Sequence, residues 1–376
     1  MSEPITSTPA ADGFRMPGEF EPHRGCWMLW PVRSDNWREQ AVPAQRAFAA
    51  VVHAIARFEP VTVGAASAQY ALARRTLEPR IRVVRLESDD AWMRDVGPTG
   101  VVDRHGAVRG VDWHFNAWGG LQGGLYFPWD RDELVARRVL DVEGLSRYRA
   151  PFVCEGGSIH ADGEGTLLVT EECLLNPNRN PQLGRRQIET LLRAYTAATQ
   201  IVWLGRGVFS DETDGHIDNL ACFVAPGEIA LLWCDDRRDP QHAISRDAFE
   251  RLQDARDARD RRFKVHKIPM PGPLEITAIE AAGLIPRAGT KPRRGGERLA
   301  ASYVNFYLAN GGVVVPLLDP RLDARVFVQL QQIFPRRRVV GVPAREILLG
   351  GGNIHCITQQ IPRGRLPQRR RQSTPK

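Results

Sequence analysis

"GGSIH" at residues 156–160 and "GGNIH" at residues 351–355 share four of their five positions within one chain of 376 residues. Two glycine turns could match by chance. Each copy, however, adjoins a residue with reactive chemistry, because Glu155 precedes the first and Cys356 follows the second. Self-similarity within a chain is typical of a repeated structural module. We therefore expect a repeated unit that brings two equivalent strand ends to one centre.

Short apolar runs alternate with amphipathic stretches along the whole chain. Runs such as "VTVGAA", "TLLVT", "EIALLW" and "VVVPLL" predict strands. Helical periodicity predicts helices over residues 41–58, 185–195, 243–253 and 325–334. No long linker interrupts the alternation, so the pattern predicts one α/β unit and not two joined domains.

The composition is that of a globular protein, with 43% hydrophobic and 25% charged residues. The uncharged stretch 299–318 could suggest a membrane span, but its asparagines, glycines and proline predict a buried helix followed by a buried strand. Residues 1–14 have neither the basic N-terminal region nor the apolar stretch of a secretory signal peptide, so we expect a flexible N-terminus without such a signal. The six cysteines form no C-x-x-C pair, which predicts free thiols in the reducing cytoplasm.

The positive charge is concentrated at the periphery of the sequence. Residues 363–376 hold six basic and no acidic side chains, and without them the formal charge falls from +7 to +1. A second basic stretch, residues 287–298, predicts a surface loop. We interpret 363–376 as a solvated, disordered tail and expect neither a nucleic-acid nor a membrane partner. Contact of this tail with nucleic acid or acidic lipid is the alternative.

Cys356 is either a buried packing residue or a nucleophile. Neighbours in an extended strand face opposite sides, so His355 would be poorly placed to assist Cys356 and is expected to be structural. A better histidine lies in "DETDGHIDNLACFV" (211–224), where a turn is predicted to enter a strand. There His216 and Asp218 would share one face. This pair could be two metal ligands, a general acid/base beside a cation-binding carboxylate, or a surface strand end.

Several carboxylates cluster near the predicted strand ends. Four acids crowd into residues 211–218, which is costly unless a cation binds there. In "DDAWMRDVGPTGVVD" (89–103), Asp95 approaches a strand and could face a ligand, whereas Asp89 and Asp90 are expected to cap a turn. Glu155 stands before two glycines, where it could orient a histidine or merely cap a turn.

The sequence contains no P-loop, no dinucleotide fingerprint and no zinc-binding spacing, so we expect no organic cofactor and no metal. A thiol, a histidine and several carboxylates suit a planar cationic electrophile. The guanidinium group fits best, because carboxylates bind its N–H edges in bidentate fashion.

Long motifs along nearly the whole chain carry a family resemblance. They are "MPGEFEPHRGCWMLWPVRSDNWRE", "DDAWMRDVGP", "FNAWGG", "EGGSIHADGEGTLLVTEECLLNPNRNP", "DETDGHIDN", "RLAASYVNFYLANGGVVVP" and "AREILLGGGNIHCITQQIP". The chain resembles the agmatine deiminase family of the guanidine-modifying enzyme superfamily. The resemblance implies a single catalytic domain over residues 15–362, a five-module pseudo-symmetric α/β propeller (pentein-like) with the active site on its axis.

Position by position, the resemblance implies a role for five residues. Cys356 matches the nucleophile and His216 the general acid/base. Asp95 and Asp218 match the guanidinium-binding carboxylates. Glu155 matches the acid that supports the histidine and contacts the charged end of the substrate.

The implied reaction hydrolyses agmatine to N-carbamoylputrescine and ammonia, a step of putrescine biosynthesis. It passes through an S-alkylthiouronium on Cys356 and needs no metal or organic cofactor. The expected partner is a small cationic guanidine, and the chain could form a homo-oligomer. Trp92 could form one wall for the far end of the substrate, or it could be core packing.

Three alternatives remain at this point. The same centre could act on arginine or peptidyl-arginine, in which case a basic group should lie at the far end of an arginine pocket. A metal-dependent hydrolase could use His160, His216 and Asp218. The protein could also bind guanidines without turnover, or bind nucleic acid through its tail.

Overall fold

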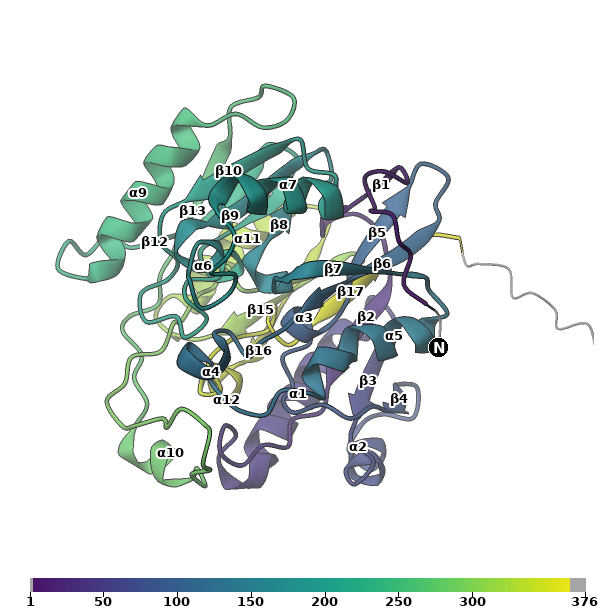
Figure 1. Ribbon diagram of the computed structural model, residues 1–376. Helices are drawn as coiled ribbons and strands as arrows, with labels where there is room; N and C mark the ends of the chain where they lie inside the picture. Colours follow the sequence, from purple (N-terminus) through teal and green to yellow (C-terminus); the bar gives the residue numbers. More distant parts are fainter. Residues whose placement is uncertain (1–2, 366–376) are drawn as a thin grey trace, which may run out of the picture.

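The structure, a computed structural model, describes residues 3–365 and confirms the α/β class (Figure 1). Of the longer helices, α9 and α1 lie at the outside of the molecule, and the short α3 lies near the middle among the strands. No helix in residues 3–365 is long and apolar enough to cross a membrane.

Strands in the described part of the chain form five sheets. In sheet order they are β1 Phe14–Arg15, β5 Thr99–Asp103, β6 Val108–His114 and β7 Arg147–Val153; β10 Gln200–Leu204, β9 Thr166–Thr170 and β8 His160–Ala161; β11 Ala221–Ala225, β12 Glu228–Trp233 and β13 Lys264–Pro269; β14 Tyr307–Ala309, β15 Gly312–Leu317 and β16 Arg338–Pro343; and β17 Gln359–Pro362, β2 His23–Leu29, β3 Val61–Ala65 and β4 Arg82–Arg85.

The helices connect or precede these strands. They are α1 Val42–Ile55, α2 Tyr70–Thr76, α3 Met93–Val96, α4 Gly120–Gly123, α5 Val135–Glu143, α6 Glu171–Leu174, α7 Arg185–Thr196, α8 Ile217–Leu220, α9 Pro240–Asp254, α10 Ala278–Ala282, α11 Asp323–Ile333 and α12 Arg345–Leu348, with 3-10 turns η1 Glu39–Ala41, η2 Asp132–Leu134 and η3 Gly156–Ser158.

One strand order recurs in all five sheets of the described chain. An antiparallel pair is followed by a third, parallel strand: β5–β6 then β7, β8–β9 then β10, β11–β12 then β13, β14–β15 then β16, and β17–β2 then β3. A parallel partner requires a crossover connection, and the longest helices supply it. These helices are α5, α7, α9, α11 and α1, in the same order as the sheets above.

The pairing of β17 with β2 joins the two ends of the described chain in one sheet. Gln359 lies opposite Trp27 and Gln360 opposite Cys26, in antiparallel register. The segment that carries Cys356 therefore lies beside strands formed early in the sequence. Local sequence contains no information about this contact.

Local signals explain individual elements. Asp239 caps α9 by accepting a hydrogen bond from the backbone N–H of Gln241 at 2.8 Å, and Pro240 occupies the first helical turn, where its missing N–H costs nothing. β3 and β9 are buried at every position, as parallel strands covered on both faces are.

The four predicted helices appear as α1, α7, α9 and α11, with ends shifted by at most a few residues. The helix predicted within 299–318 is wrong. Residues 299–306 are irregular, and the strands β14 and β15 follow them. The apolar residues at 299–306 are apolar because they are buried, and burial alone does not distinguish a helix from an extended loop.

The division into an N-terminal segment, a domain and a tail stays a prediction. Within the N-terminal segment, Ile5 forms a β-bridge with Tyr148, and Asp12 accepts a 2.7 Å hydrogen bond from the Tyr148 hydroxyl. Of the predicted tail, residues 366–376 lie outside the described residues. Arg363 and Arg365 still donate backbone hydrogen bonds to Pro22 and Gly106.

Two isoleucines test the core. Ile229 in β12 is fully buried, whereas the side chain of Ile279 in α10 is 83% exposed. Ile229→Ala should lower the free energy of unfolding by about 2–5 kcal/mol, because it removes buried methyl groups and leaves a cavity. Ile279→Ala should change it by no more than about 0.5 kcal/mol. Urea titration of both variants checks this, and equal midpoints would contradict the core assignment.

Candidate active site

Each sheet's antiparallel pair is preceded by a short turn, and the five turns meet. They are α3 before β5, η3 before β8, α8 before β11, residues 302–305 before β14 and residues 353–356 before β17. Backbone contacts tie neighbouring turns together: Arg94 N donates to Cys356 O at 3.0 Å, and His355 N donates to Asn305 O at 3.2 Å. All six candidate residues but Trp92 lie in or directly beside these turns, and Trp92 immediately precedes α3.

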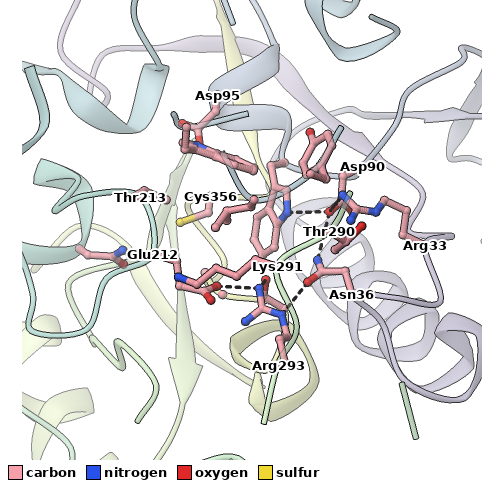
Figure 2. A pocket seen from close by; sticks show the side chains of 18 residues that line it. Arg33, Asn36, Asp90, Asp95, Glu212, Thr213, Thr290, Lys291, Arg293 and Cys356 are labelled. Atoms are coloured by element: carbon pink, nitrogen blue, oxygen red, sulfur yellow. Dashed lines mark hydrogen bonds and ion pairs between the residues drawn. The ribbon is translucent and has the colours of Figure 1, made fainter. Parts of the chain in front are cut away.

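Cys356 lines a partly open cavity between the turns. Figure 2 shows its sulfur on the cavity side, between Asp95 and Glu212. The Sγ lies 3.2 Å from Asn305 Nδ2 and 3.6 Å from Asp218 Oδ2. Burial raises the pKa of the Cys356 thiol well above its ordinary value, and the nearby Asp218 and Asp95 raise it further. Without a bound cation, the site therefore holds a thiol.

His216 lies between two carboxylates. Its Nδ1 is 3.8 Å from Asp95 Oδ1, and its Nε2 is 3.7 Å from Glu155 Oε2. Burial alone would lower the pKa of His216, but Asp95 and then Cys173 and Glu155 raise it well above the ordinary value. The ring is therefore an imidazolium at neutral pH, able to donate a proton.

Glu155 is fully buried behind His216. Arg179 Nε donates to Glu155 Oε1 at 2.7 Å. Burial alone would raise the pKa of Glu155, but the guanidinium of Arg179 and the charge of His216 lower it to about 2. Glu155 does not line the cavity, and its paired partner is a side chain of the protein.

The two candidate guanidinium ligands have different surroundings. Asp95 accepts hydrogen bonds from Gly157 N at 2.9 Å and Trp118 Nε1 at 3.0 Å, and burial raises its pKa to about 6. Asp218 is as deeply buried, but a 2.8 Å contact between its Oδ2 and the Nδ1 of His355 outweighs burial and lowers the pKa of Asp218. The Oδ1 of Asp218 is buried and has no partner in the described structure.

The second glycine of each echoed motif makes room for this centre. A Cβ on Gly157 would lie 2.5 Å from His216 Nδ1 and 2.9 Å from Asp95 Oδ1. A Cβ on Gly352 would lie 2.6 Å from the Trp92 ring and 3.0 Å from Cys356 Sγ. At each position at least one of these distances is below 3.0 Å, which a real Cβ would not tolerate unless its neighbours shifted, so the paired glycines allow the close approach that the sequence suggested.

The structure corrects two predicted conformations. His216 and Asp218 do not lie on a strand: His216 is the residue before α8, Asp218 lies within it, and the strand begins at Ala221. His355 and Cys356 lie in a turn, not in an extended strand. The ring nitrogens of His355 contact Asp218 and Glu19, and Cys356 faces the cavity.

Trp92 lines the cavity, and its Nε1 donates to Asp90 Oδ2 at 3.1 Å. Asp90, which the sequence suggested as a turn cap, also lines the cavity and accepts a 2.8 Å bond from Trp37 Nε1. The Oδ2 of Asp89 accepts a 2.8 Å hydrogen bond from Arg131 N, which lies 42 residues away and immediately before η2, so this contact does not cap the turn that contains Asp89.

Part of the predicted surface loop 287–298 reaches the cavity. Lys291 and Arg293 both line it, and the Arg293 side chain is only 7% exposed and pairs with Glu212 at 2.6 Å. The charged residues of this loop predicted exposure to solvent. The local sequence does not distinguish a solvated arginine from one that is buried with a partner. Asn305 was also missed as a neighbour of the thiol, since no pattern in "YVNFYL" marks it.

The three residues of the metal alternative do not form one ligand group. His160 lies 3.6 Å from Glu19, and its ring stacks on His355 at a centroid distance of 6.1 Å. Within residues 3–365, the groups spaced to hold an ion are Glu19 with His160 and His355, and Glu155 with Cys173 and His216. His160 thus belongs to a different group from His216, and Asp218 belongs to neither.

Comparison with known proteins gives consistent matches. Residues 15–362 match the family model described as Porphyromonas-type peptidyl-arginine deiminase. The chain is 58% identical to agmatine deiminase of Pseudomonas aeruginosa (strain LESB58), over 96% of this chain and 99% of that protein. It is also 58% identical to agmatine deiminase of Stutzerimonas stutzeri (strain A1501), over 95% and 98%. The solved structure of agmatine deiminase of Enterococcus faecalis matches with a TM-score of 0.94 at 47% identity, over 96% and 100%.

Alkylation of the free protein tests the electrostatics of the thiol. Asp95→Asn removes a buried negative charge beside Cys356, so the thiol pKa should fall and iodoacetamide should react faster at pH 8, by about three- to tenfold. Asp254→Asn, an exposed aspartate at the end of α9, should leave the rate unchanged. Cys356→Ala gives the background from the other five thiols, which are all buried. An Asp95→Asn rate equal to that of the wild type would contradict the assigned coupling.

Proposed function

The chain belongs to the Porphyromonas-type peptidyl-arginine deiminase family, and we propose that it is an iminohydrolase that converts agmatine and water to N-carbamoylputrescine and ammonia. One observation carries the proposal: the thiol of Cys356 and the carboxylate of Asp95 line one cavity, and a second carboxylate and an imidazolium lie directly behind them. Asp218 Oδ2 is 3.6 Å from the thiol, and His216 Nδ1 is 3.8 Å from Asp95. The agmatine deiminase names of relatives 58% identical over nearly the whole chain support agmatine as the substrate.

Binding would begin with the charge of the substrate. The unpartnered Oδ1 of Asp218 can accept one N–H edge of a guanidinium, and Asp95 can accept another. A cation held there offsets the two negative charges that raise the thiol pKa. Cys356 then ionises more easily when the substrate is bound, its proton passing to solvent, and the two carboxylates align the planar group for attack.

Two covalent steps follow. The thiolate of Cys356 attacks the central guanidinium carbon and forms a C–S bond. One terminal nitrogen takes a proton from His216, its C–N bond breaks, and it leaves as ammonia. An S-alkylthiouronium remains. The neutral His216 then removes a proton from water, and the resulting hydroxide adds to the same carbon. The C–S bond breaks while the added hydroxyl loses its proton to solvent, which gives the ureido product and thiolate. Glu155, paired with Arg179, keeps His216 in place through both steps.

We propose further that the five sheets are the modules of a pseudo-symmetric propeller around this site. The repeated antiparallel–parallel strand order and the five converging turns support this arrangement. We also propose a cytoplasmic location, which the six free cysteines support.

Arginine is a second candidate substrate. It needs a basic group for its α-carboxylate, and Lys291 lines the cavity and forms no ion pair within residues 3–365. Lys291→Ala would discriminate between the two readings. It should raise KM for arginine if that carboxylate binds there, and it should leave KM for agmatine unchanged or lower it, because the substrate amine is cationic.

The first experiment is ammonia release from agmatine and from arginine, with wild type and Cys356→Ala. We expect release from agmatine that Cys356→Ala abolishes, because the reaction requires the C–S bond. The Cys222→Ala variant serves as a matched control, since Cys222 is a buried thiol in β11. Release that survives in Cys356→Ala would overturn the nucleophile, and release only from arginine would move the substrate assignment to the second candidate.

The pH profile tests Asp95. Its pKa in the free protein is about 6, and only its carboxylate form holds the cation. Below that value kcat/KM, which reports the free enzyme, should fall by up to about tenfold per pH unit, and above it the acid limb should level off. Steady-state rates between pH 5 and 8 give this limb. A kcat/KM that does not change between pH 5 and 7 would contradict the assignment.

A further inference from the structure

A buried chain of alternating charges lies beneath Asp218. The Nδ1 of His355 is 2.8 Å from Asp218 Oδ2, and its Nε2 is 2.9 Å from both oxygens of Glu19. Arg94 Nη1 donates to Glu19 Oε1 at 2.8 Å. The four side chains are at most 5% exposed. Each ring nitrogen of His355 faces a carboxylate, and so each carries a proton.

These alternating charges stabilise Asp218 in its ionised form. Asp218 lies near Asp95 and the thiol of Cys356, and two buried carboxylates so close disfavour each other's ionisation. The positive groups that act on Asp218 are His355, His216 and Arg94. Of these, only His355 touches its carboxylate. The contact also has a direction: it occupies Oδ2 and leaves Oδ1 buried without a partner in the described chain.

We propose that Glu19 and His355 are positioning residues of the reaction: Glu19 keeps His355 doubly protonated, and His355 turns the ionised Asp218 so that Oδ1 meets the guanidinium. The ring is fixed on a third side by His160, which stacks on it at an interplanar angle of 29°. The role toward the guanidinium rests on the proposed function, whereas the charge chain itself does not.

The protein contains a matched pair that separates positioning from folding. Glu59 and His23 are also a buried glutamate and histidine, with Glu59 Oε1 3.2 Å from His23 Nδ1. The hydroxyl of Tyr307 donates to the same oxygen at 2.7 Å. Neither residue lines the cavity. Glu59→Gln therefore reproduces the loss of a buried carboxylate beside a histidine without touching Asp218.

Kinetics with agmatine test the proposal. Glu19→Gln and His355→Asn should each raise KM on the order of tenfold to a hundredfold, the value of a charge-assisted hydrogen bond, with a smaller effect on kcat. His355→Asn keeps an N–H donor for Asp218 but loses the charge. The double variant should raise KM no further than His355→Asn alone, because both substitutions interrupt the same series of buried charges. Glu59→Gln should leave KM unchanged, even if its Tm falls.

The acid limb of kcat/KM supplies a readout that a structural role would not move. The pKa of Asp218 is held low by His355, so it should rise in Glu19→Gln and His355→Asn. Asp218 would then titrate together with Asp95 in the acid range, and the acid limbs of these variants should become steeper or shift to higher pH. Equal KM values and equal limbs for Glu19→Gln and Glu59→Gln would overturn the proposal.

A substrate-free measurement keeps the two proposals distinguishable. In protein with ¹⁵N-labelled histidine, the signals absent from His355→Asn belong to His355. They should show two protonated ring nitrogens at pH 8 in the wild type, and one in Glu19→Gln. If the wild type releases no ammonia from agmatine while these signals behave as expected, the function proposal fails and the charge chain stands. A His355 that titrates near its ordinary pKa in the wild type overturns the chain.

Discussion

Burial of carboxylates is the constraint on which this centre depends, because a buried anion is tolerated only beside a cation or several donors. Three of the acids around the thiol have such cations: Glu155 has Arg179, Asp218 has His355, and Glu19 has Arg94. Asp95 has neutral donors in direct contact, and its nearest cation is the imidazolium of His216 at 3.8 Å, which it shares with Glu155. Burial outweighs that shared cation and raises the pKa of Asp95 to about 6. A guanidinium substrate would place a second cation beside Asp95.

The same buried charges couple binding to reactivity. Burial and the negative charges of Asp218 and Asp95 raise the pKa of the Cys356 thiol, so the group that we propose as the nucleophile ionises less readily without a bound cation. A neutral or anionic molecule that entered the cavity would leave the thiol pKa high. In the proposed reaction, selectivity for a cation and activation of the Cys356 thiol would therefore have one electrostatic cause.

The fold holds this concentration of charge in place by distributing the charged groups over five turns. Each turn ends a connection and begins a strand, so its side chains are anchored by a sheet. Each turn contributes one or two polar groups, and backbone hydrogen bonds such as Arg94 to Cys356 link the turns. Rigid anchoring matters here because the charged groups gain from one another only at short, fixed distances.

The sequence by itself determined the α/β class, four of the main helices and the strands of high β propensity, because hydrophobic periodicity is a local property. Its long motifs also suggested the six candidate residues, whose roles are proposals. The echoed glycines also had a local signature, and in the structure they make room for His216 and Cys356. The pairing of β17 with β2, the inward position of Arg293, the approach of Asn305 to the thiol and the chain from Arg94 to Asp218 were decided only by the tertiary structure. These contacts join residues far apart in the chain. Whether a charged side chain is solvated or buried depends on the partner that folding brings to it, and no local pattern contains that partner.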